Sequence, residues 1–230
     1  MKALIVSAFA LFATAALSDP PPEALAAAKA HNQSILAKSP DAGGIFTVQE
    51  DGTIKHLQSD LVCPNYFPNV ELWHLEVIES KGMDVGCDYG RNDTDGKWTA
   101  KLTIFATRAP EGTTLDSAFQ NYRNEVLQVT PGAVSQGEAL RDGNKPGTDP
   151  LHSYRSEEFV SQRDGVTNTD QLYVFVSDNW MYEIRVTFPG LPNRIDLKKG
   201  DTVETAQQMA GDRVMGAMAL LRTLPQRKLP

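Results

Sequence analysis

The sequence predicts an α+β fold, in which an antiparallel β-sheet of about six to eight strands packs against a central and a C-terminal helix. Apolar and polar residues alternate over three successive segments between residues 72 and 106, which is typical of half-buried antiparallel strands. The hydrophobic period becomes helical over residues 113–129, returns to alternation up to residue 188, and is helical again over residues 203–224. An antiparallel sheet with helices on one or both faces buries both helical stripes.

Residues 1–18 predict a cleaved export signal. Lys2 precedes an apolar run from Ala3 to Leu17, and small residues occupy the positions before Asp19 that a signal peptidase reads. The run is shorter than the roughly 20 residues that span a bilayer as a helix, and the proline-rich segment after it ends any helix. We therefore expect a periplasmic or secreted protein with no membrane span after cleavage.

The mature chain is long enough for one sizeable core. We expect an N-terminal helical arm at residues 19–44 and a single α+β domain at residues 45–230. Four apolar side chains share one stripe of the arm helix: Leu25, Ala28, Ile35 and Leu36. The formal net charge of −7 and the absence of a Lys/Arg cluster exclude nucleic acid and anionic membrane surfaces as main partners.

The first strands are predicted from turns and alternation. Two short β-rich runs flank Asp51–Gly52, which is a strong hairpin signal. In the next segment we expect Trp73, Leu75 and Val77 on the buried face of a strand and His74 on the opposite face.

The central helix and the last hairpin have clear boundaries. Thr113 is the expected N-cap of the helix, and Asp116 lies near the positive end of its dipole. Two alternating runs on either side of Asp178–Asn179 predict a hairpin. A weaker strand is expected near residues 133–140.

The two cysteines, Cys63 and Cys87, lack the CxxC spacing of redox and metal sites. In an oxidising compartment they predict one disulfide, which closes a loop of about 25 residues and stabilises the fold by roughly 3 to 4 kcal/mol. The alternatives are a thiolate nucleophile with His56 or His74 as its base, and a Cys/His zinc site. A zinc site favours short paired ligand spacings, which this sequence does not contain.

Other motifs give no catalytic, metal or cofactor prediction. Ser135 occupies the serine position of a nucleophile elbow, but a helix and a turn precede it where the elbow needs a strand. Residues 91–96 resemble a calcium loop, yet Arg91 and Leu102 stand where an EF-hand needs acidic ligands. A weaker, irregular calcium site stays open, with Asp84, Asp88, Asp93 and Asp95 as candidate ligands.

Aromatic residues gather near the predicted turns and strand ends. If several of them share an exposed sheet face, they form an apolar binding surface. Trp180, beside the tight turn, is the residue that we most expect to be exposed. The candidate ligand-face residues are Trp73, Trp98, Trp180, Tyr182, His74 and His152.

Three passages from Trp98 to the C-terminus resemble the PsbP-like superfamily, which includes small exported bacterial proteins. They are "LTIFATRAPEGTTLDSAFQNYRNEVLQVTPGAV", the hairpin "QLYVFVSDNWMYEIRVTF" and the closing "AGDRVMGAMALLRTL". The resemblance covers roughly 130 residues. It implies a sandwich of a sheet and helices, and a non-catalytic accessory or binding role.

We therefore expect a non-enzymatic exported binding or accessory domain, whose partner is an unknown small molecule or an envelope protein. One alternative is an exported hydrolase, which requires His56, His74 or His152 within hydrogen-bonding reach of a nucleophile or of two carboxylates. Another is an interaction subunit of a cell-envelope assembly, which requires a flat apolar patch in place of a concave pocket.

Overall fold

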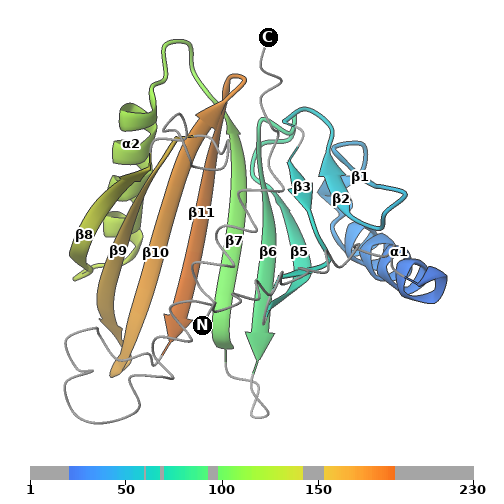
Figure 1. Cartoon of the computed structure of the whole chain (residues 1–230), viewed down its shortest axis with the longest axis horizontal. Coiled ribbons are helices and arrows are strands. Elements are labelled where there is room, and N and C mark those ends of the chain that lie inside the picture. The colour runs from blue at the N-terminus through green and yellow to red at the C-terminus, as the bar shows by residue number, and fades with distance from the viewer. Residues whose placement is uncertain (1–20, 60, 68–69, 93–97, 142–152, 190–230) are drawn as a thin grey trace, which may run out of the picture.

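The computed structural model describes residues 21–59, 61–67, 70–92, 98–141 and 153–189. Within these ranges the chain forms two α-helices, a three-stranded antiparallel sheet and an eight-stranded antiparallel sheet (Figure 1). The predicted α+β class is therefore confirmed. The expected export signal, His152 and the expected closing helix lie outside the described residues.

The eight-stranded sheet consists of two sequential meanders that meet side by side. Its strands, in spatial order, are β4 (Tyr66–Phe67), β5 (Val70–Val77), β6 (Asp84–Asn92), β7 (Trp98–Arg108), β11 (Trp180–Pro189), β10 (Val166–Ser177), β9 (Tyr154–Arg163) and β8 (Val134–Arg141). Every described pair of neighbours is antiparallel. The predicted meander between residues 72 and 106 is β5–β6–β7 and is confirmed.

The hairpin between β10 and β11 turns at Asp178 and Asn179, as the sequence predicts. Both residues have positive φ, 50° and 64°, which is what a two-residue type I′ turn requires. Asp and Asn adopt this conformation more readily than most residues with a Cβ atom. The turn fixes the register in which Ser177 pairs with Trp180, and the facing of all later side chains follows from that register.

Helix α2 (Leu115–Val129) packs on the face of the sheet that β9 and β10 contribute (Figure 1). Its buried residues are Ala118, Phe119, Tyr122 and Val126. They form one core cluster with Phe159, Leu172, Val174 and Met181 of the sheet. The helical period over residues 113–129 is thus confirmed.

The start of α2 differs from the prediction by one residue. Thr114, not Thr113, is the N-cap: its Oγ1 accepts the backbone N–H of Ser117 at 3.1 Å, and Ser117 Oγ accepts the backbone N–H of Thr114 at 3.0 Å. This reciprocal pair is a capping box. Thr113 instead donates its hydroxyl to the carbonyl of Pro110 at 2.7 Å, which stabilises the turn before the helix.

A second layer covers the opposite face of the sheet. It is the three-stranded sheet of β1 (Phe46–Val48), β2 (Ile54–His56) and β3 (Val62–Cys63). Its buried residues form the larger core cluster together with Tyr182, whereas the adjacent Met181 belongs to the α2 cluster. Because neighbouring residues of a strand face opposite sides, the two clusters lie on opposite faces of the large sheet.

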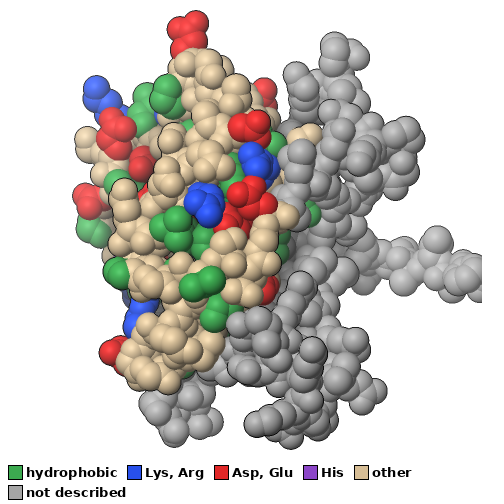
Figure 2. All heavy atoms as spheres, turned by 90° about the vertical axis from the view of Figure 1, so that its left-hand side faces the viewer, with side chains coloured by type: hydrophobic (Ala, Val, Ile, Leu, Met, Phe, Trp, Pro, Cys, Tyr) green, Lys and Arg blue, Asp and Glu red, His purple; other side chains and the backbone are tan. Residues whose placement is uncertain are grey.

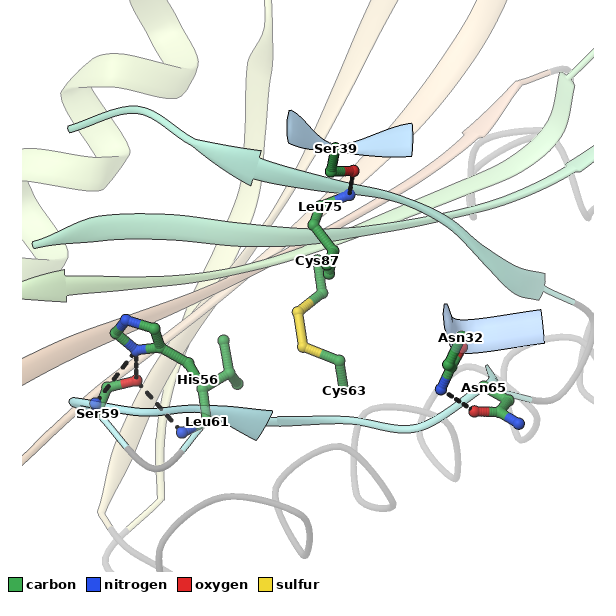
Figure 3. Close-up of a disulfide and its surroundings, with 9 residues drawn as sticks. All are labelled: Asn32, Ser39, His56, Ser59, Leu61, Cys63, Asn65, Leu75 and Cys87. Atoms are coloured by element: carbon green, nitrogen blue, oxygen red, sulfur yellow. Dashed lines mark hydrogen bonds between the residues drawn. A yellow bond between two sulfur atoms is a disulfide. The ribbon is translucent and has the colours of Figure 1, made fainter. Parts of the chain in front are cut away.

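The predicted disulfide is present and joins the two sheets. Cys63 of β3 is bonded to Cys87 of β6, and both cysteines are fully buried (Figure 3). Cys87 pairs across the sheet with Leu75 of β5. The bond therefore crosses the larger core and holds the second layer on the main sheet.

The predicted arm is the helix α1 (Pro22–Lys38), followed by the 3₁₀ turn η1 (Pro40–Ala42). Ile35 of the predicted stripe is buried, and so is Asn32, which the stripe did not include. Asn32 Nδ2 donates to the carbonyl of Gly52 at 2.6 Å and also to Asn65 (Figure 3). No helix in the described ranges combines the length and apolar character needed to cross a membrane.

Candidate functional site

Trp180 and Tyr182 belong to the core, so their predicted place on an exposed ligand face is wrong. Trp180 is 2% exposed and Tyr182 is fully buried. The Trp180 ring lies 5.5 Å from the ring of His56, and the Tyr182 hydroxyl donates to the carbonyl of Ser59 at 2.7 Å. Both contacts come from the second layer, which covers the start of β11.

Trp73, another candidate for the ligand face, is exposed to solvent. The register of β5 shifts between Leu72 and His74, so a β-bulge interrupts the alternation at this point. Leu72 and Leu75 are therefore buried and Trp73 is 46% exposed, which corrects the prediction of a buried Trp73. The His74 ring lies 5.4 Å from that of Trp73. The side chain of Trp98 and the whole of His152 lie outside the described residues.

Two histidines lie beside serine hydroxyls, which is the geometry that the hydrolase alternative requires. His56 Nδ1 is 2.7 Å from Ser59 Oγ, and His74 Nδ1 is 3.5 Å from Ser39 Oγ. Ser59 is 3% exposed and its Oγ accepts the backbone N–H of Leu61 at 3.2 Å (Figure 3).

Ser39 is 4% exposed and its Oγ accepts the backbone N–H of Leu75 at 3.4 Å. Hydroxyls that are buried and bonded to the backbone stabilise the chain around them, and a substrate cannot reach them.

The remaining sequence candidates also have structural roles. Ser135 lies within β8, where its Oγ accepts the backbone N–H of Gly137 at 3.3 Å, so no strand–turn–helix elbow surrounds it. Asp84 and Asp88 accept the hydroxyls of Thr107 and Thr103 at 2.9 and 2.6 Å. No group of His, Cys, Asp or Glu among the described residues has the arrangement of a metal site. Asp93 and Asp95 lie outside those residues.

The structure shows a cavity that the sequence did not predict. It is an open cavity of about 250 Å³ between the C-terminal end of α2 and strands β7, β11, β10 and β9. Its lining residues are Lys101, Thr103, Phe105, Val126, Val129, Thr130, Phe159, Arg163, Asp170, Gln171, Leu172, Arg185 and Thr187.

Strand register explains why these side chains converge. Lys101 of β7 pairs with Thr187 of β11, and Thr187 pairs with Asp170 of β10. The next row on the same face contains Thr103 and Arg185. Cross-strand neighbours have their Cβ atoms about 5 Å apart, so the two rows form one continuous floor for the cavity.

Phe105 forms part of the cavity wall, and a glycine fixes its position. A Cβ atom on Gly86 of the neighbouring strand would lie 2.9 Å from the Phe105 ring. The ring therefore lies close to Gly86, where only a hydrogen atom leaves room for it.

Ion pairs attach α2 to the sheet along the length of the helix. On β9, Arg155 Nη1 lies 2.8 Å from Asp116 Oδ1, at the start of the helix. Arg123 of the helix donates from Nε to Glu157 Oε2 at 2.8 Å. Figure 2 shows basic and acidic side chains next to one another on this side of the molecule.

The ion pair closest to the cavity is made by Arg185. Its Nη2 lies 2.9 Å from Glu125 Oε1 of α2, and its Nε donates to Glu183 on the same strand. Glu183 is 1% exposed. Burial raises the pKa of Glu183 to about 7, although the Arg185 guanidinium opposes the rise; the charges of Glu125 and Asp84 add to it.

A separate pair of hydrogen bonds links α2 to β7 and β6. The Tyr122 hydroxyl donates to Thr107 Oγ1 at 3.0 Å, and Thr107 donates to Asp84. Burial raises the pKa of Tyr122, and it raises that of Asp84 against the effect of the Thr107 hydrogen bond. Burial thus disfavours the charged forms of Tyr122 and Asp84, while Arg185 is paired with Glu125 and Glu183.

The sequence contained a partial signal for the cavity. Alternation predicts Leu102 and Ile104 on the buried face of β7, and it necessarily places Lys101, Thr103 and Phe105 on the other face. A polar strand face opposite a helix indicates a site when the helix does not fill it. The position of the helix end over the sheet could not be read from the pattern.

No protein-family model matches the chain, and no curated protein matches it significantly. Among solved structures, the crystal structure of PA94, a protein of unknown function from Pseudomonas aeruginosa, is similar to it. The TM-score is 0.36 at 12% sequence identity, over 74% of this chain and 95% of that chain. A similarity at this level supports no conclusion on fold or function.

Proposed function

We propose that this protein is an exported, non-enzymatic binding or accessory domain that holds a small ligand in the cavity beneath α2. The cavity is the observation that carries the proposal. Its lining combines apolar side chains such as Phe105 and Val129 with polar and charged groups, and polar groups of this kind fix the orientation of a bound small molecule. Among the described residues no histidine lines it, so it lacks the usual general base.

Two further observations support the exported character. Residues 1–18 have the composition of a cleaved signal, and the buried disulfide is the kind of bond that persists in oxidising compartments. The order of strands and helix from Trp98 onward supports a PsbP-like fold as part of the same proposal.

The ligand-binding proposal can be tested with two matched valines. Val129 and Val166 are both exposed, at 58% and 42%, but only Val129 lines the cavity. Ligand-observed NMR of the mature protein against a fragment library should give ligands whose signals weaken in Val129→Trp and persist in Val166→Trp. A library without a single fragment that distinguishes the two variants would contradict the proposal.

Export can be tested separately. Full-length protein expressed in its source organism should be recovered outside the cytosol, with an N-terminus near Asp19. Full-length protein that stays in the cytosol with Met1 and Lys2 intact would contradict export, and leave the cavity proposal unaffected.

Two other experiments address the alternatives. Ester hydrolysis that disappears in Ser39→Ala or Ser59→Ala would support a hydrolase. Cross-linking to an envelope protein without any small-molecule ligand would support an interaction subunit.

A further inference from the structure

We propose that the ligand of this cavity is a small amphipathic anion, with one carboxylate, sulfonate or phosphate group on an apolar body, and that Lys101 and Arg163 bind the negative group. This inference rests on the proposed function above, and it adds the chemical class of the ligand and the residues that select it.

The charge of the lining is opposite in sign to that of the protein. The whole chain has a formal net charge of −7, yet three basic residues, Lys101, Arg163 and Arg185, line the cavity beside a single carboxylate, Asp170. An acidic protein that concentrates cations at one concave site presents a local field that favours anions.

Two of the three cations are available to a ligand. Arg185 is already paired with Glu125 and Glu183. Lys101 Nζ lies 3.9 Å from Asp88, and its side chain is 49% exposed, so this ion pair is long and weak. Arg163 forms no ion pair with any described residue, and it is exposed at the end of β9.

Asp88 and Asp170 each accept a hydrogen bond from a threonine hydroxyl. Asp88 Oδ1 accepts the Thr103 hydroxyl at 2.6 Å, so it keeps a close donor if Lys101 turns towards a ligand. Asp170 Oδ1 accepts the Thr187 hydroxyl at 2.6 Å. The one carboxylate of the lining is thus fixed on the floor, while both available cations are exposed to solvent and able to reach a charged group at the opening.

The walls define the rest of the ligand. Val129 is 58% exposed and Phe105 is partly exposed. They give the cavity an accessible apolar surface that a hydrocarbon or aromatic body would contact. A small inorganic anion would leave this surface unused, which is why we infer an amphipathic ligand.

Two fluorescent probes separate the charge from the apolar body. 1-Anilinonaphthalene-8-sulfonate and N-phenyl-1-naphthylamine share one aromatic body and differ by the sulfonate. We expect the sulfonate to bind the mature protein in a 1:1 complex and more tightly than the neutral probe. Lys101→Gln and Arg163→Gln should each weaken the binding of the sulfonate probe by about tenfold. Each should change the affinity of the neutral probe by less than about twofold. Added salt should weaken the binding of the sulfonate probe and leave that of the neutral probe unchanged.

A control variant removes two positive charges outside the cavity, as many as Lys101→Gln/Arg163→Gln removes inside it. Lys38 and Lys81 are exposed and do not line the cavity, so Lys38→Gln/Lys81→Gln should leave both probes unchanged. Lys101→Arg should retain the binding of the sulfonate. A circular dichroism melting curve of each variant would show whether its fold is intact.

The outcomes distinguish this inference from the proposed function. If both probes bind equally and the Lys101→Gln/Arg163→Gln protein binds them as the wild type does, selection for anions is refuted and a neutral-ligand cavity survives. If Lys38→Gln/Lys81→Gln weakens the sulfonate as much as Lys101→Gln/Arg163→Gln does, net charge explains binding and the assignment of these two residues is refuted. If neither probe binds, or if Val129→Trp binds both like the wild type, the cavity is not a binding site and both proposals fall.

Discussion

Replacing Glu183 with glutamine should stabilise the protein above pH 7 and remove much of its pH dependence between pH 4.5 and 7. Glu183 is buried beside Arg185, and burial raises its pKa from 4.5 to about 7. Below pH 4.5 the carboxyl is protonated in both the folded and the unfolded chain. Above pH 7 it is ionised in both, and the folded protein bears the cost of a buried charge.

The size and sign of the effect follow from these two pKa values. Between them the folded state binds more protons than the unfolded state, so the free energy of unfolding falls as the pH rises. A pKa rise from 4.5 to about 7 corresponds to about 3 kcal/mol, which is lost by the time the pH reaches 7. Glutamine stays neutral at every pH, so the free energy of unfolding of Glu183→Gln should not fall in this way.

Urea denaturation of the mature, disulfide-bonded protein between pH 5 and pH 8 measures the effect. Burial also raises the pKa values of Asp84 and Glu76, so the difference between Glu183→Gln and wild type isolates Glu183. Glu71→Gln, at an exposed position of β5, is the control. If Glu183→Gln lowers stability at every pH, the ionised pair with Arg185 is favourable, and the argument from burial is wrong.

Three other predictions concern stability alone. Cys63→Ala/Cys87→Ala should lose roughly 3 to 4 kcal/mol in urea denaturation, and uptake of an alkylating reagent by the native, unreduced protein would contradict the bond. Trp180→Ala should lose about 3 to 5 kcal/mol, because the ring is buried; a loss below about 1 kcal/mol would mean that the ring is not packed. Thr114→Ala should lower the free energy of unfolding by about 1 kcal/mol, because Thr114 is the N-cap of α2. An equal loss in Thr113→Ala would indicate that Thr113, the N-cap predicted from the sequence, has this role.

Local patterns predicted the elements that local physics determines. The period of α2, the meander of β5 to β7 and the turn at Asp178–Asn179 depend on residues within a few positions of one another, and all three are confirmed. The disulfide was predicted without any geometry, because there are two cysteines and the expected compartment is oxidising.

The errors have a common cause in contacts between distant segments. Trp180 is buried because residues of the second layer cover it, and the adjacent Tyr182 bonds to Ser59, 123 residues earlier in the chain. Trp73 is exposed because one extra residue at a bulge reverses the facing of the strand. The cavity depends on where α2 ends above β10 and β11, which no hydrophobic period encodes.

The strand order of the large sheet also has a consequence for folding. Each described neighbour pair in that sheet joins strands that are consecutive in sequence, except where β7 meets β11. Each half, β4 to β7 and β8 to β11, can therefore form by zipping of short hairpins, with little loop-closure entropy. Only the seam between the halves must bring together segments separated by α2 and three strands, so its formation should be the slow, committing event in assembly of this sheet.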